Sequence, residues 1–397
     1  WTRKARNKDK DGQDNLYLSS ILALNPDNGR IVWHYQTTPG DNWDYTAVQQ
    51  MILAEIEWKG VQRKVLMQAP KNGFFYLLDR ETGELLAADP YTRVTWAEKV
   101  DLKTGRPIET KNSDYSVSPK EIKPGPHGGH NWQAMSYNPV RKLVFIPTIE
   151  SSMIYKDDPN WKYKLGFWNV AVDFDTDAPS NLDLPQGGLI AWDPVNRKRI
   201  WGVNHINEYN GGTLATAGDL VFQGNGEANF IAYEAESGKK LWSYFTGTAI
   251  IAPPVTYHAN GEQFISVLAG WGGSVGLRNA PSGIAAEYFQ EGILYTFQLG
   301  GKGRRPELIK HPRTKLTGPE IKIALDEESA KSGESLYKEH CSKCHGLVDG
   351  KAGVIPDLAT SPPEMHQIWQ QIVGEGILAG SKGMPQFKDR LTTKEIS

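Results

Sequence analysis

The sequence predicts a mainly β protein, a portion of a β-propeller, followed by a small all-α domain. Two observations carry this prediction. Four segments before residue 298 share one pattern of strand, tight turn and strand, and the 13 Trp, 40 Gly and 24 Pro residues suit many short strands joined by turns. The remainder has helical patterns instead, and it holds the only two cysteines of the chain, Cys341 and Cys344.

The four similar segments are spaced like the blades of a propeller. They are ILALNPDNGRIVWHY (21–35), FYLLDRETGELLAAD (75–89), LIAWDPVNRKRIWGV (189–203) and FIAYEAESGKKLWSY (230–244). Each has an apolar strand, then Asn, Asp or Glu, a turn often closed by Gly, and a second strand. A spacing of about 40 to 57 residues per unit is typical of propeller blades or similar arrays. Ordinary hairpins in a β-sandwich are the alternative.

A Trp recurs at one place in three of these segments, ten residues after an Ala: Ala23 and Trp33, Ala191 and Trp201, and Ala232 and Trp242. The second segment carries Leu77 and Ala87 at these places. The turn between the strands supplies the left-handed residue that a tight hairpin needs. We expect the Trp to lie on a neighbouring sheet and to bury its ring there.

After residue 298 the pattern changes, which predicts a propeller portion over residues 1–298, a linker over 299–325 and a small helical domain over 326–397. The linker is basic and punctuated by Pro and Gly. Helices are predicted for DEESAKSGESLYKEHC, from Asp326, and for MHQIWQQIVGEGI (365–377), and Thr393 is the predicted N-cap of a further helix. Because the chain starts without Met or a signal-peptide pattern and stops where a helix begins, we expect a fragment of a longer protein.

Charge and hydropathy exclude several classes of protein. Lys and Arg total 44 against 46 Asp and Glu, a net charge of −2, which argues against a general nucleic-acid binder or a basic membrane-surface protein. No run of 18 apolar residues occurs, so no transmembrane segment is predicted. No G-x-G-x-x-G motif follows a strand, so a nicotinamide enzyme is not indicated.

Cys341-Ser-Lys-Cys344-His345 is a C-x-x-C-H run, the attachment signal of c-type haem. Thiols one helical turn apart can bond the two vinyl groups of one porphyrin, and His345 then lies beneath the iron as an axial ligand. Met384, in the Gly-rich and Pro-containing stretch GSKGMPQF, is the best candidate for the second ligand, and a thioether there raises the reduction potential. Met365 is the rival, but it falls inside a predicted helix.

Two other uses of this cysteine pair are a redox disulfide and half of a zinc site. A zinc site needs two further ligands, and no other Cys exists to supply them. A redox dithiol has no use for the adjacent His.

Several motifs, in order, resemble the pyrroloquinoline quinone (PQQ) dependent alcohol dehydrogenases. They are DNLYLSSILALNPDNGRIVWHYQTTPGDNWDYTAVQ, APKNGFFYLLDRETG, GGHNWQAMSYNP, NGGTLATAGDLVFQG and LAGWGGSVGL. Together with the haem motif they are similar to the quinohaemoprotein alcohol dehydrogenases, over about residues 13 to 390. The resemblance implies an eight-bladed propeller of W-motif sheets, of which this chain would hold about half, and a fused cytochrome c domain. The remaining blades would lie upstream.

The resemblance also implies roles for individual residues. Asp44, in DNWDYT, matches the aspartate that binds Ca²⁺ and takes the alcohol proton while hydride passes to C5 of PQQ. Lys71 matches the basic residue at the quinone oxygens, Asn131 and Trp132 match a PQQ-contacting pair, and Val275 in WGGSVG would give a further PQQ contact. Ca²⁺ prefers oxygen ligands and polarises a carbonyl, and a carboxylate near the substrate hydroxyl can act as general base.

Each of these residues also has an ordinary structural explanation. An Asp after Trp near a strand end is often a turn cap, a Lys before Asn-Gly is often a solvated residue, and a loop Asn often bonds its own backbone. WGGSVG could be a plain Gly-rich turn.

The chain departs from the family pattern at some places. Thr46 lies where lanthanide-using relatives carry another aspartate, which favours Ca²⁺ here, and Asn210 lies where methanol-oxidising relatives carry Trp. The family's other calcium ligands and its vicinal disulfide would lie before residue 1, so Asp44 is the one metal ligand to be named for Ca²⁺. His127 and His130 form only a weak metal signal, because no carboxylate accompanies them in the loop.

We therefore expect a periplasmic enzyme that oxidises primary or secondary alcohols with PQQ and Ca²⁺ and passes electrons singly to haem c. An external acceptor would follow: a blue-copper protein, a cytochrome or a quinone-linked complex. One alternative is a PQQ–haem dehydrogenase of a bulky alcohol such as polyvinyl alcohol or lupanine. Another is a non-catalytic propeller scaffold with an electron-relay haem. The periplasm is expected because haem attachment and the upstream disulfide require an oxidising compartment.

Overall fold

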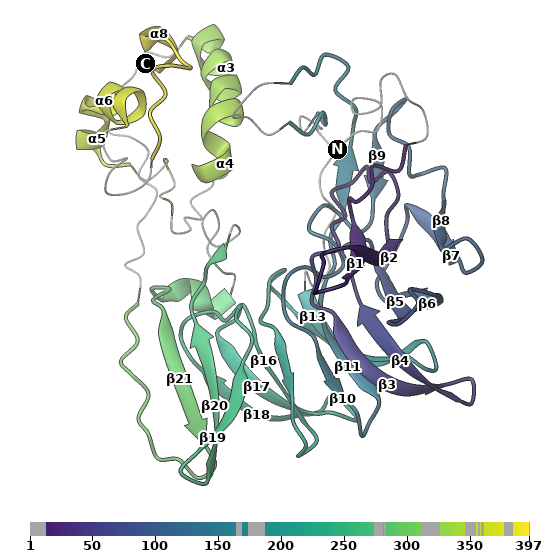
Figure 1. The fold of residues 1–397 in the computed structure, drawn as a ribbon. Helices are drawn as coiled ribbons and strands as arrows, with labels where there is room; N and C mark the ends of the chain where they lie inside the picture. The colour runs from purple at the N-terminus through teal and green to yellow at the C-terminus, as the bar shows by residue number, and fades with distance from the viewer. Residues whose placement is uncertain are drawn as a thin grey trace. The chain divides into compact units, whose positions relative to one another are not determined.

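The protein is described by a computed structural model that covers residues 13–163, 169–173, 187–273, 281, 283–310, 326–345, 355, 358, 361–376 and 384–396. The chain divides into two compact units. The first comprises residues 1–270, 282–285 and 290–307, and the second comprises 271–281, 286–289 and 308–397. All the strands described lie in the first unit and the α-helices in the second (Figure 1).

The first unit is a succession of antiparallel sheets. A two-stranded sheet pairs β1 (Ser20–Leu24) with β2 (Ile31–Gln36). Three four-stranded sheets follow: β3 (Ile52–Trp58), β4 (Val61–Gln68), β5 (Phe74–Asp79) and β6 (Leu85–Pro90); β10 (Ser136–Asn138), β11 (Leu143–Ile149), β13 (Gly187–Asp193) and β14 (Lys198–His205); β15 (Thr213–Ala215), β16 (Leu220–Gly224), β17 (Asn229–Glu234) and β18 (Lys240–Phe245). A three-stranded sheet joins β19 (Val255–Ala259), β20 (Glu262–Ala269) and β21 (Ile293–Gln298).

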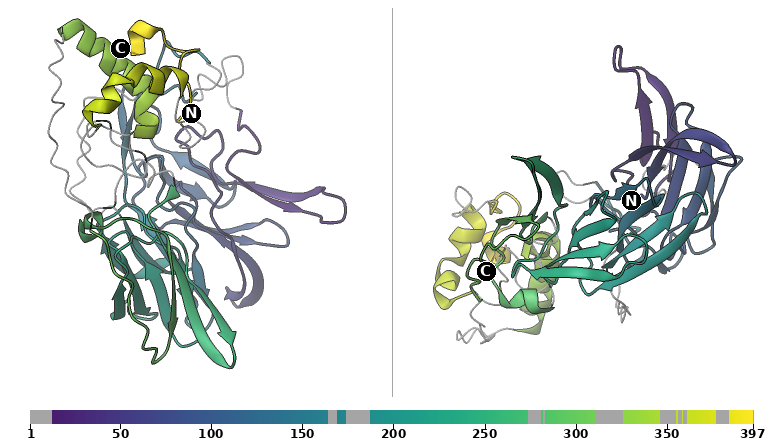
Figure 2. Two further views of the ribbon diagram at one scale, coloured as in Figure 1. Left: turned by 90° about the vertical axis from the view of Figure 1, so that its left-hand side faces the viewer. Right: turned by 90° about the horizontal axis from the view of Figure 1, so that it is seen from below.

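Two short pairs complete the strands of the described residues: β7 (Ala97–Asp101) with β8 (Arg106–Glu109), and β9 (Lys120–Ile122) with β12 (Met153–Tyr155). The larger sheets follow one another in chain order, as the purple-to-green colouring shows (Figure 2). In two of the four-stranded sheets each strand pairs with the next strand in sequence, and in the third β11 pairs with β13 because β12, which lies between them in the chain, pairs with β9 instead. Successive sheets of this kind are propeller blades, so the predicted mainly β class and blade architecture are confirmed, and the β-sandwich alternative is wrong.

The core lies between consecutive sheets, because strand side chains point alternately to the two faces. In β5, Phe74, Tyr76 and Leu78 face the β1–β2 sheet and pack with Ile21 and Tyr35. The alternate side chains of β5, Phe75 and Leu77, face the β10–β14 sheet and pack with Val144 and Ile190. Because strands buried on both faces need apolar residues at every position, β5 is wholly buried and its sequence, FFYLLD, shows no alternation.

The ten-residue spacing of Ala and Trp is a strand register. Ala23 pairs with Trp33, Ala191 with Trp201, Ala232 with Trp242, and Leu77 with Ala87 in the second segment. In each hairpin the register shifts immediately after this pair, which marks a bulge at the same place. The four segments are thus the outer hairpins of four consecutive sheets.

Two of the Trp rings lie on a turn of the next hairpin. A Cβ added at Gly83, which has φ +78°, would lie 2.8 Å from Trp33, and one at Gly238, with φ +71°, would lie 2.6 Å from Trp201. Trp201 also donates from Nε1 to the carbonyl of Ala235 at 2.9 Å. The turn glycine is therefore needed twice, for its positive φ and for the space that the ring occupies. Both rings are half-buried, whereas the third, Trp242, is 39% exposed, so the expected burial of the ring is only partly confirmed.

The segment without Trp shows the complementary arrangement. Ala87 takes the place of the indole, and the following hairpin has Arg197, with φ +60°, where the others have Gly. Arg197 donates from Nε and Nη2 to the two carboxylate oxygens of Asp89, both at 2.7 Å. Where no ring covers the turn, a long side chain can occupy the space. The two sheets are then joined by the bidentate salt bridge between Arg197 and Asp89.

The second unit holds the helices α3 (Glu327–Leu336), a π-helical turn (Tyr337–Cys341), α4 (Ser342–His345), α5 (Pro363–Gln367), α6 (Trp369–Glu375) and α8 (Thr393–Ile396). A 3₁₀ turn at Gly283–Glu287 precedes them. Asp326 caps α3 by accepting from the backbone N–H of Ser329 at 2.8 Å, so the predicted helix after Asp326 is confirmed.

Two details of the predicted helices are wrong. The single helix over 365–377 is two helices, α5 and α6, separated at Ile368, and α6 ends at Gly376 in the left-handed conformation. The N-cap of α8 is Thr392 rather than Thr393. Thr392 Oγ1 accepts from the N–H of Glu395 at 3.3 Å, and the carboxylate of Glu395 accepts from the N–H of Thr392 at 2.8 Å, which is a capping box.

The helical unit has a small apolar core of Val373, Phe387, Leu391 and Ile396, against which Met384 and Trp369 pack. Among the described residues, no helix is long and apolar enough to cross a membrane.

Candidate functional site

Asp44 is held in a conformation that few non-glycine residues adopt. Its φ is +69°, and its neighbours Trp43 and Tyr45 are completely buried. The N–H of Trp43 donates to Asp41 Oδ1 at 3.1 Å and its indole Nε1 donates to the carbonyl of Ser113 at 3.2 Å, while Tyr45 donates its hydroxyl to the carbonyl of Pro124 at 2.5 Å. Because both flanking rings are fixed inward, the backbone at Asp44 must turn outward, and it stores strain of about 1–3 kcal/mol.

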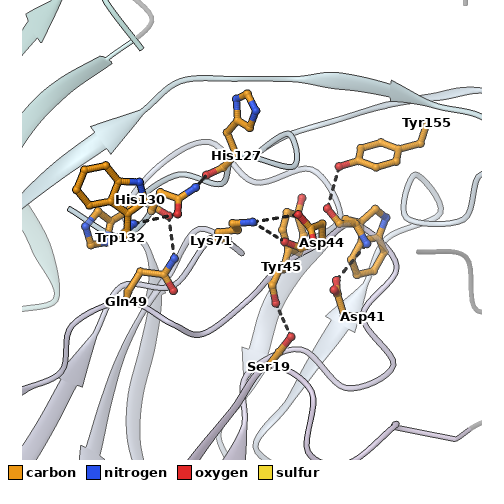
Figure 3. A network of polar contacts seen from close by, with 12 residues as sticks. Ser19, Asp41, Asp44, Tyr45, Gln49, Lys71, His127, His130, Trp132 and Tyr155 are labelled. Atoms are coloured by element: carbon orange, nitrogen blue, oxygen red, sulfur yellow. Dashed lines mark hydrogen bonds and ion pairs between the residues drawn. The ribbon is translucent and has the colours of Figure 1, made fainter. Parts of the chain in front are cut away.

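Lys71 provides the partner of this carboxylate. Its Nζ donates to Asp44 Oδ2 and to the backbone carbonyl of Asp44, both at 3.1 Å (Figure 3). The Lys71 side chain is 10% exposed and that of Asp44 is 37% exposed, so a nearly buried cation lies beside a carboxylate that still reaches solvent. The sequence places these residues 27 positions apart, and only the packing of the sheets brings them together.

The Lys71 backbone is fixed by its neighbours. Asn72 is fully buried, and its Nδ2 lies 3.1 Å from the carbonyl of Thr37 and 2.8 Å from the hydroxyl of Tyr76. Trp96 donates from Nε1 to the carbonyl of Asn72 at 2.8 Å. The alternative explanation of Lys71 as a solvated residue before an Asn-Gly turn is therefore wrong. Asn72 helps to form the site, and the sequence analysis did not single it out.

Asn131 and Trp132 lie in the loop of residues 125–133, which also contacts Lys71. The N–H of Gly129 donates to the carbonyl of Lys71 at 2.9 Å. Gly128 has φ +84°, and a Cβ there would lie 2.5 Å from the Lys71 side chain, so only glycine allows this contact. Asn131 donates to the carbonyl of His127 at 2.9 Å, and Trp132, whose own N–H donates to Asn131 Oδ1, is 43% exposed.

The two histidines of this loop do not form a metal pair. His130 is fully buried, with Nδ1 2.8 Å from the carbonyl of Ala69 and Nε2 2.7 Å from that of Gln133. Burial lowers the pKa of His130, an effect larger than the opposite one of its two carbonyl partners. Nδ1 of His127 instead lies 2.6 Å from Oε1 of Glu208, a residue of the loop between β14 and β15. Nothing in the sequence pattern indicated Glu208.

Asn210 has a structural role in the same later loop. It is buried, donates from Nδ2 to the carbonyl of Asn207 at 2.8 Å, and accepts from the N–H of Gly226 at 3.0 Å. Asn210 thus fastens the turn that carries Glu208. Thr46 has a buried hydroxyl with no hydrogen-bond partner within the described structure, and Val275 lies outside the described residues.

Cys341 ends the π-helical turn after α3, and Cys344 lies in α4. Both Cys341 and Cys344 are free thiols, the first half-buried and the second exposed, and His345 is half-buried. Burial raises the pKa of the Cys341 thiol, and the nearby Cys344 raises it further. Met384 lies on the apolar core of this unit, whereas Met365, in α5, is half-buried outside that core.

The described residues offer one carboxylate toward a hard cation at the Asp44 site. No group of three or more His, Cys, Asp or Glu side chains that could hold a metal ion occurs within the described parts of the chain. Asp44 Oδ1 accepts no hydrogen bond there, so it is available as an oxygen ligand. Further ligands of a Ca²⁺ site would have to come from elsewhere.

Two models of known protein families match this chain. The family model "Glucose/ethanol/alcohol dehydrogenase, beta-propeller domain", which is labelled PQQ, matches residues 5–98 and 170–265. The model "Cytochrome C oxidase, cbb3-type, subunit III" matches residues 328–397.

Individual relatives align with this chain over its whole length. The chain is 43% identical to quinohemoprotein alcohol dehydrogenase ADH IIB of Pseudomonas putida and 40% identical to the 1-butanol dehydrogenase (cytochrome c) of Thauera butanivorans. Each alignment covers 100% of this chain and 57% of the relative, so the chain spans little more than half their length. A solved quinohemoprotein alcohol dehydrogenase, ADHIIG from Pseudomonas putida HK5, superposes with a TM-score of 0.90 at 40% identity, over 100% of this chain and 59% of that one.

One explanation accounts for the order of the blades and the helical unit along the chain and for the sequence identity over its whole length. This chain belongs to the family of PQQ-dependent quinohaemoprotein alcohol dehydrogenases, whose propeller and cytochrome c portions it joins in one polypeptide.

Proposed function

We propose that this chain is part of an enzyme that oxidises primary or secondary alcohols to aldehydes or ketones with PQQ, Ca²⁺ and haem c. The observation that carries the proposal is Asp44: a strained, outward-facing carboxylate with one oxygen free and the other on a nearly buried lysine. Strained residues at fixed positions are concentrated in active sites. The names of the relatives support the reaction class.

The residues present fit the cofactors of this family. The Lys71 ammonium suits anionic or carbonyl oxygens, the exposed Trp132 indole offers a flat face for a planar ring system, and the free Asp44 oxygen suits a hard cation. When bound, PQQ would supply the two-electron acceptor, Ca²⁺ a positive charge beside it, and haem a one-electron outlet.

The chain's own residues would prepare the substrate for oxidation. The Asp44 carboxylate would accept the hydroxyl proton of the alcohol, because a carboxylate at hydrogen-bond distance is a general base. Lys71 holds one of its oxygens, Oδ2, and so fixes the direction of the carboxylate. Its positive charge, nearly buried, favours negative charge on groups bound next to it.

In the helical unit, Cys341 and Cys344 would hold the haem through thioether bonds, and His345 and Met384 would bind its iron. We assign residues 1–298 to the propeller, 299–325 to the linker and 326–397 to the cytochrome c domain. Covalent haem attachment supports a periplasmic location, and the electrons would leave to an external acceptor, a blue-copper protein, a cytochrome or a quinone-linked complex. The similarity to the 1-butanol dehydrogenase (cytochrome c) of Thauera butanivorans supports a small primary alcohol as the substrate.

The test is a dye-reduction assay of the full-length enzyme with PQQ and Ca²⁺ over a panel from ethanol and 1-butanol to lupanine and polyvinyl alcohol. Asp44→Asn is expected to lower kcat by about 10²–10⁴-fold, because the general base is lost. Asp27→Asn, in an exposed turn of the first hairpin, is the control. The haem spectrum and bound PQQ content, measured in parallel, separate a lost base from a lost cofactor.

An Asp44→Asn enzyme that keeps its PQQ and its wild-type kcat would refute the role of Asp44. A wild-type enzyme that turns over lupanine or polyvinyl alcohol but not the small alcohols would favour the bulky-alcohol alternative. Absence of turnover on every alcohol would favour the non-catalytic scaffold.

A further inference from the structure

The contact between His127 and Glu208 joins two loops that enter consecutive sheets. His127 lies between β9 and β10, and Glu208 lies between β14 and β15, 81 residues later. Nδ1 of the imidazole and Oε1 of the carboxylate are 2.6 Å apart, and the Glu208 side chain is 23% exposed. The imidazole also meets the buried ring of Tyr209 edge-on, at 5.7 Å between centroids. His127 thus contacts two adjacent residues of the later loop.

A continuous path of hydrogen bonds connects this pair with Trp132. The backbone carbonyl of His127 accepts from Asn131 Nδ2 at 2.9 Å, and Asn131 Oδ1 accepts from the N–H of Trp132 at 2.9 Å. Asn131 can satisfy both contacts only while His127 keeps its place in the loop. Through the carbonyl of His127, the pair therefore acts on the two residues assigned to PQQ contact.

The backbone that carries Glu208 is held in place by hydrogen bonds. The half-buried carboxylate of Glu227 accepts from the N–H of Asn207 at 2.9 Å and from its Nδ2 at 3.0 Å, so the residue before Glu208 is held at two points. Asn225 donates to the other oxygen of Glu227 at 2.7 Å. A carboxylate fixed in this way can determine where the opposite loop lies.

Loop 125–133 also contacts Lys71, the partner of Asp44. Gly128, next to His127, rests against the stem of Lys71, and its lack of a Cβ leaves a contact that any other residue would block. Lys71 in turn binds Asp44 (Figure 3). A displacement of His127 would therefore move the Asn131–Trp132 end of the loop relative to Lys71.

We propose that Glu208 is a positioning residue: through His127 it holds loop 125–133 so that Asn131 and Trp132 are oriented for PQQ. This inference rests on the proposed function of the site. In this proposal Glu208 acts on the site through its contact with His127 and through the bond of Asn131 to His127.

The test is the dissociation constant of PQQ for the full-length apoenzyme with Ca²⁺, measured by equilibrium dialysis. Glu208→Ala is expected to weaken PQQ binding by about tenfold, since a charge-assisted contact is lost. Glu208→Gln is expected to recover most of the affinity, because its amide oxygen still accepts from His127. Glu81→Ala removes another carboxylate, 2.8 Å from Lys64 in an exposed turn, and is expected to leave the affinity unchanged.

The double variant Glu208→Ala with Asn131→Ala distinguishes positioning from general destabilisation. Since Glu208 acts through Asn131, the double variant is expected to bind PQQ no more weakly than Asn131→Ala alone. If Glu208→Ala does not fold, His127→Phe replaces it, because the phenyl ring can keep the contact with Tyr209 while losing the pair. The inference would be overturned if the double variant bound PQQ more weakly than Asn131→Ala alone. It would also be overturned if a folded Glu208→Ala or His127→Phe enzyme kept the wild-type PQQ affinity. Neither result would affect the proposed function. A wild-type apoenzyme that does not bind PQQ would overturn the proposed function as well.

Discussion

Substitution of the turn glycine Gly83 by Ala tests whether the sheets are joined by a ring packed on a turn. Gly83 has φ +78°, and an added Cβ would lie 2.8 to 3.0 Å from three ring atoms of Trp33. Gly29 occupies the corresponding turn position of the first hairpin with φ +68°, and nothing lies within 4 Å of its Cβ position. The pair of variants Gly83→Ala and Gly29→Ala therefore differs mainly in the contact with the indole.

The expected magnitude follows from this difference. Both variants place a Cβ in the left-handed region, which costs about 1–2 kcal/mol, and both reduce the freedom of the unfolded chain to a similar extent. Only Gly83→Ala forces a rigid ring to move, and overpacking of this kind costs about 1–3 kcal/mol. We therefore expect Gly83→Ala to be less stable than Gly29→Ala by about 2 kcal/mol.

The assay is calorimetric unfolding of the full-length variants, compared at the transition of the propeller. A further pair of variants, made in a Trp33→Ala background, removes the ring, and the difference between the two glycine substitutions should then disappear. Equal destabilisation by both variants in the wild-type background, or a difference that persists without Trp33, would show that the ring does not require the glycine.

Other predictions concern the cofactors and pH. Lys71→Met is expected to weaken PQQ binding about tenfold or more in dialysis, because a nearly buried cation is lost, and unchanged binding would contradict its assignment. Cys341→Ser should leave one thioether and shift the α-band of the pyridine haemochrome to longer wavelength. Met384→His should lower the reduction potential measured by potentiometric titration, and an unaltered potential would exclude Met384 as a ligand. Burial lowers the pKa of His130, so below about pH 6.5 the unfolded chain binds a proton that the folded chain does not. Stability should therefore fall as the pH decreases from 7 to 5, and less steeply in His130→Gln if the protein folds.

Local patterns explain why much of the fold could be predicted. The spacing of Ala23 and Trp33 is a hairpin register, which depends only on strand pairing and turn length. Asp326 was predictable as the start of a helix because capping involves residues three positions apart. The break at Ile368 and the shift of the cap to Thr392 were missed, since boundaries depend on how a segment packs.

The candidate site was only partly visible in the sequence. Asp44, Lys71, Asn131 and Trp132 were named by resemblance, but neither their contacts nor the strain at Asp44 could be read from spacing. Glu208 was missed completely, because a carboxylate in a loop has no local signature and its partner is 81 residues away.

By itself, the sequence determined the elements and the haem attachment motif, because strand pairing, turns, caps and C-x-x-C-H all operate over a few residues. Only the tertiary structure decided that a nearly buried Lys71 faces Asp44 and that a loop from one sheet is held by Glu208 of the next. Such contacts arise from the packing of whole sheets against one another, and they depend on every side chain between them.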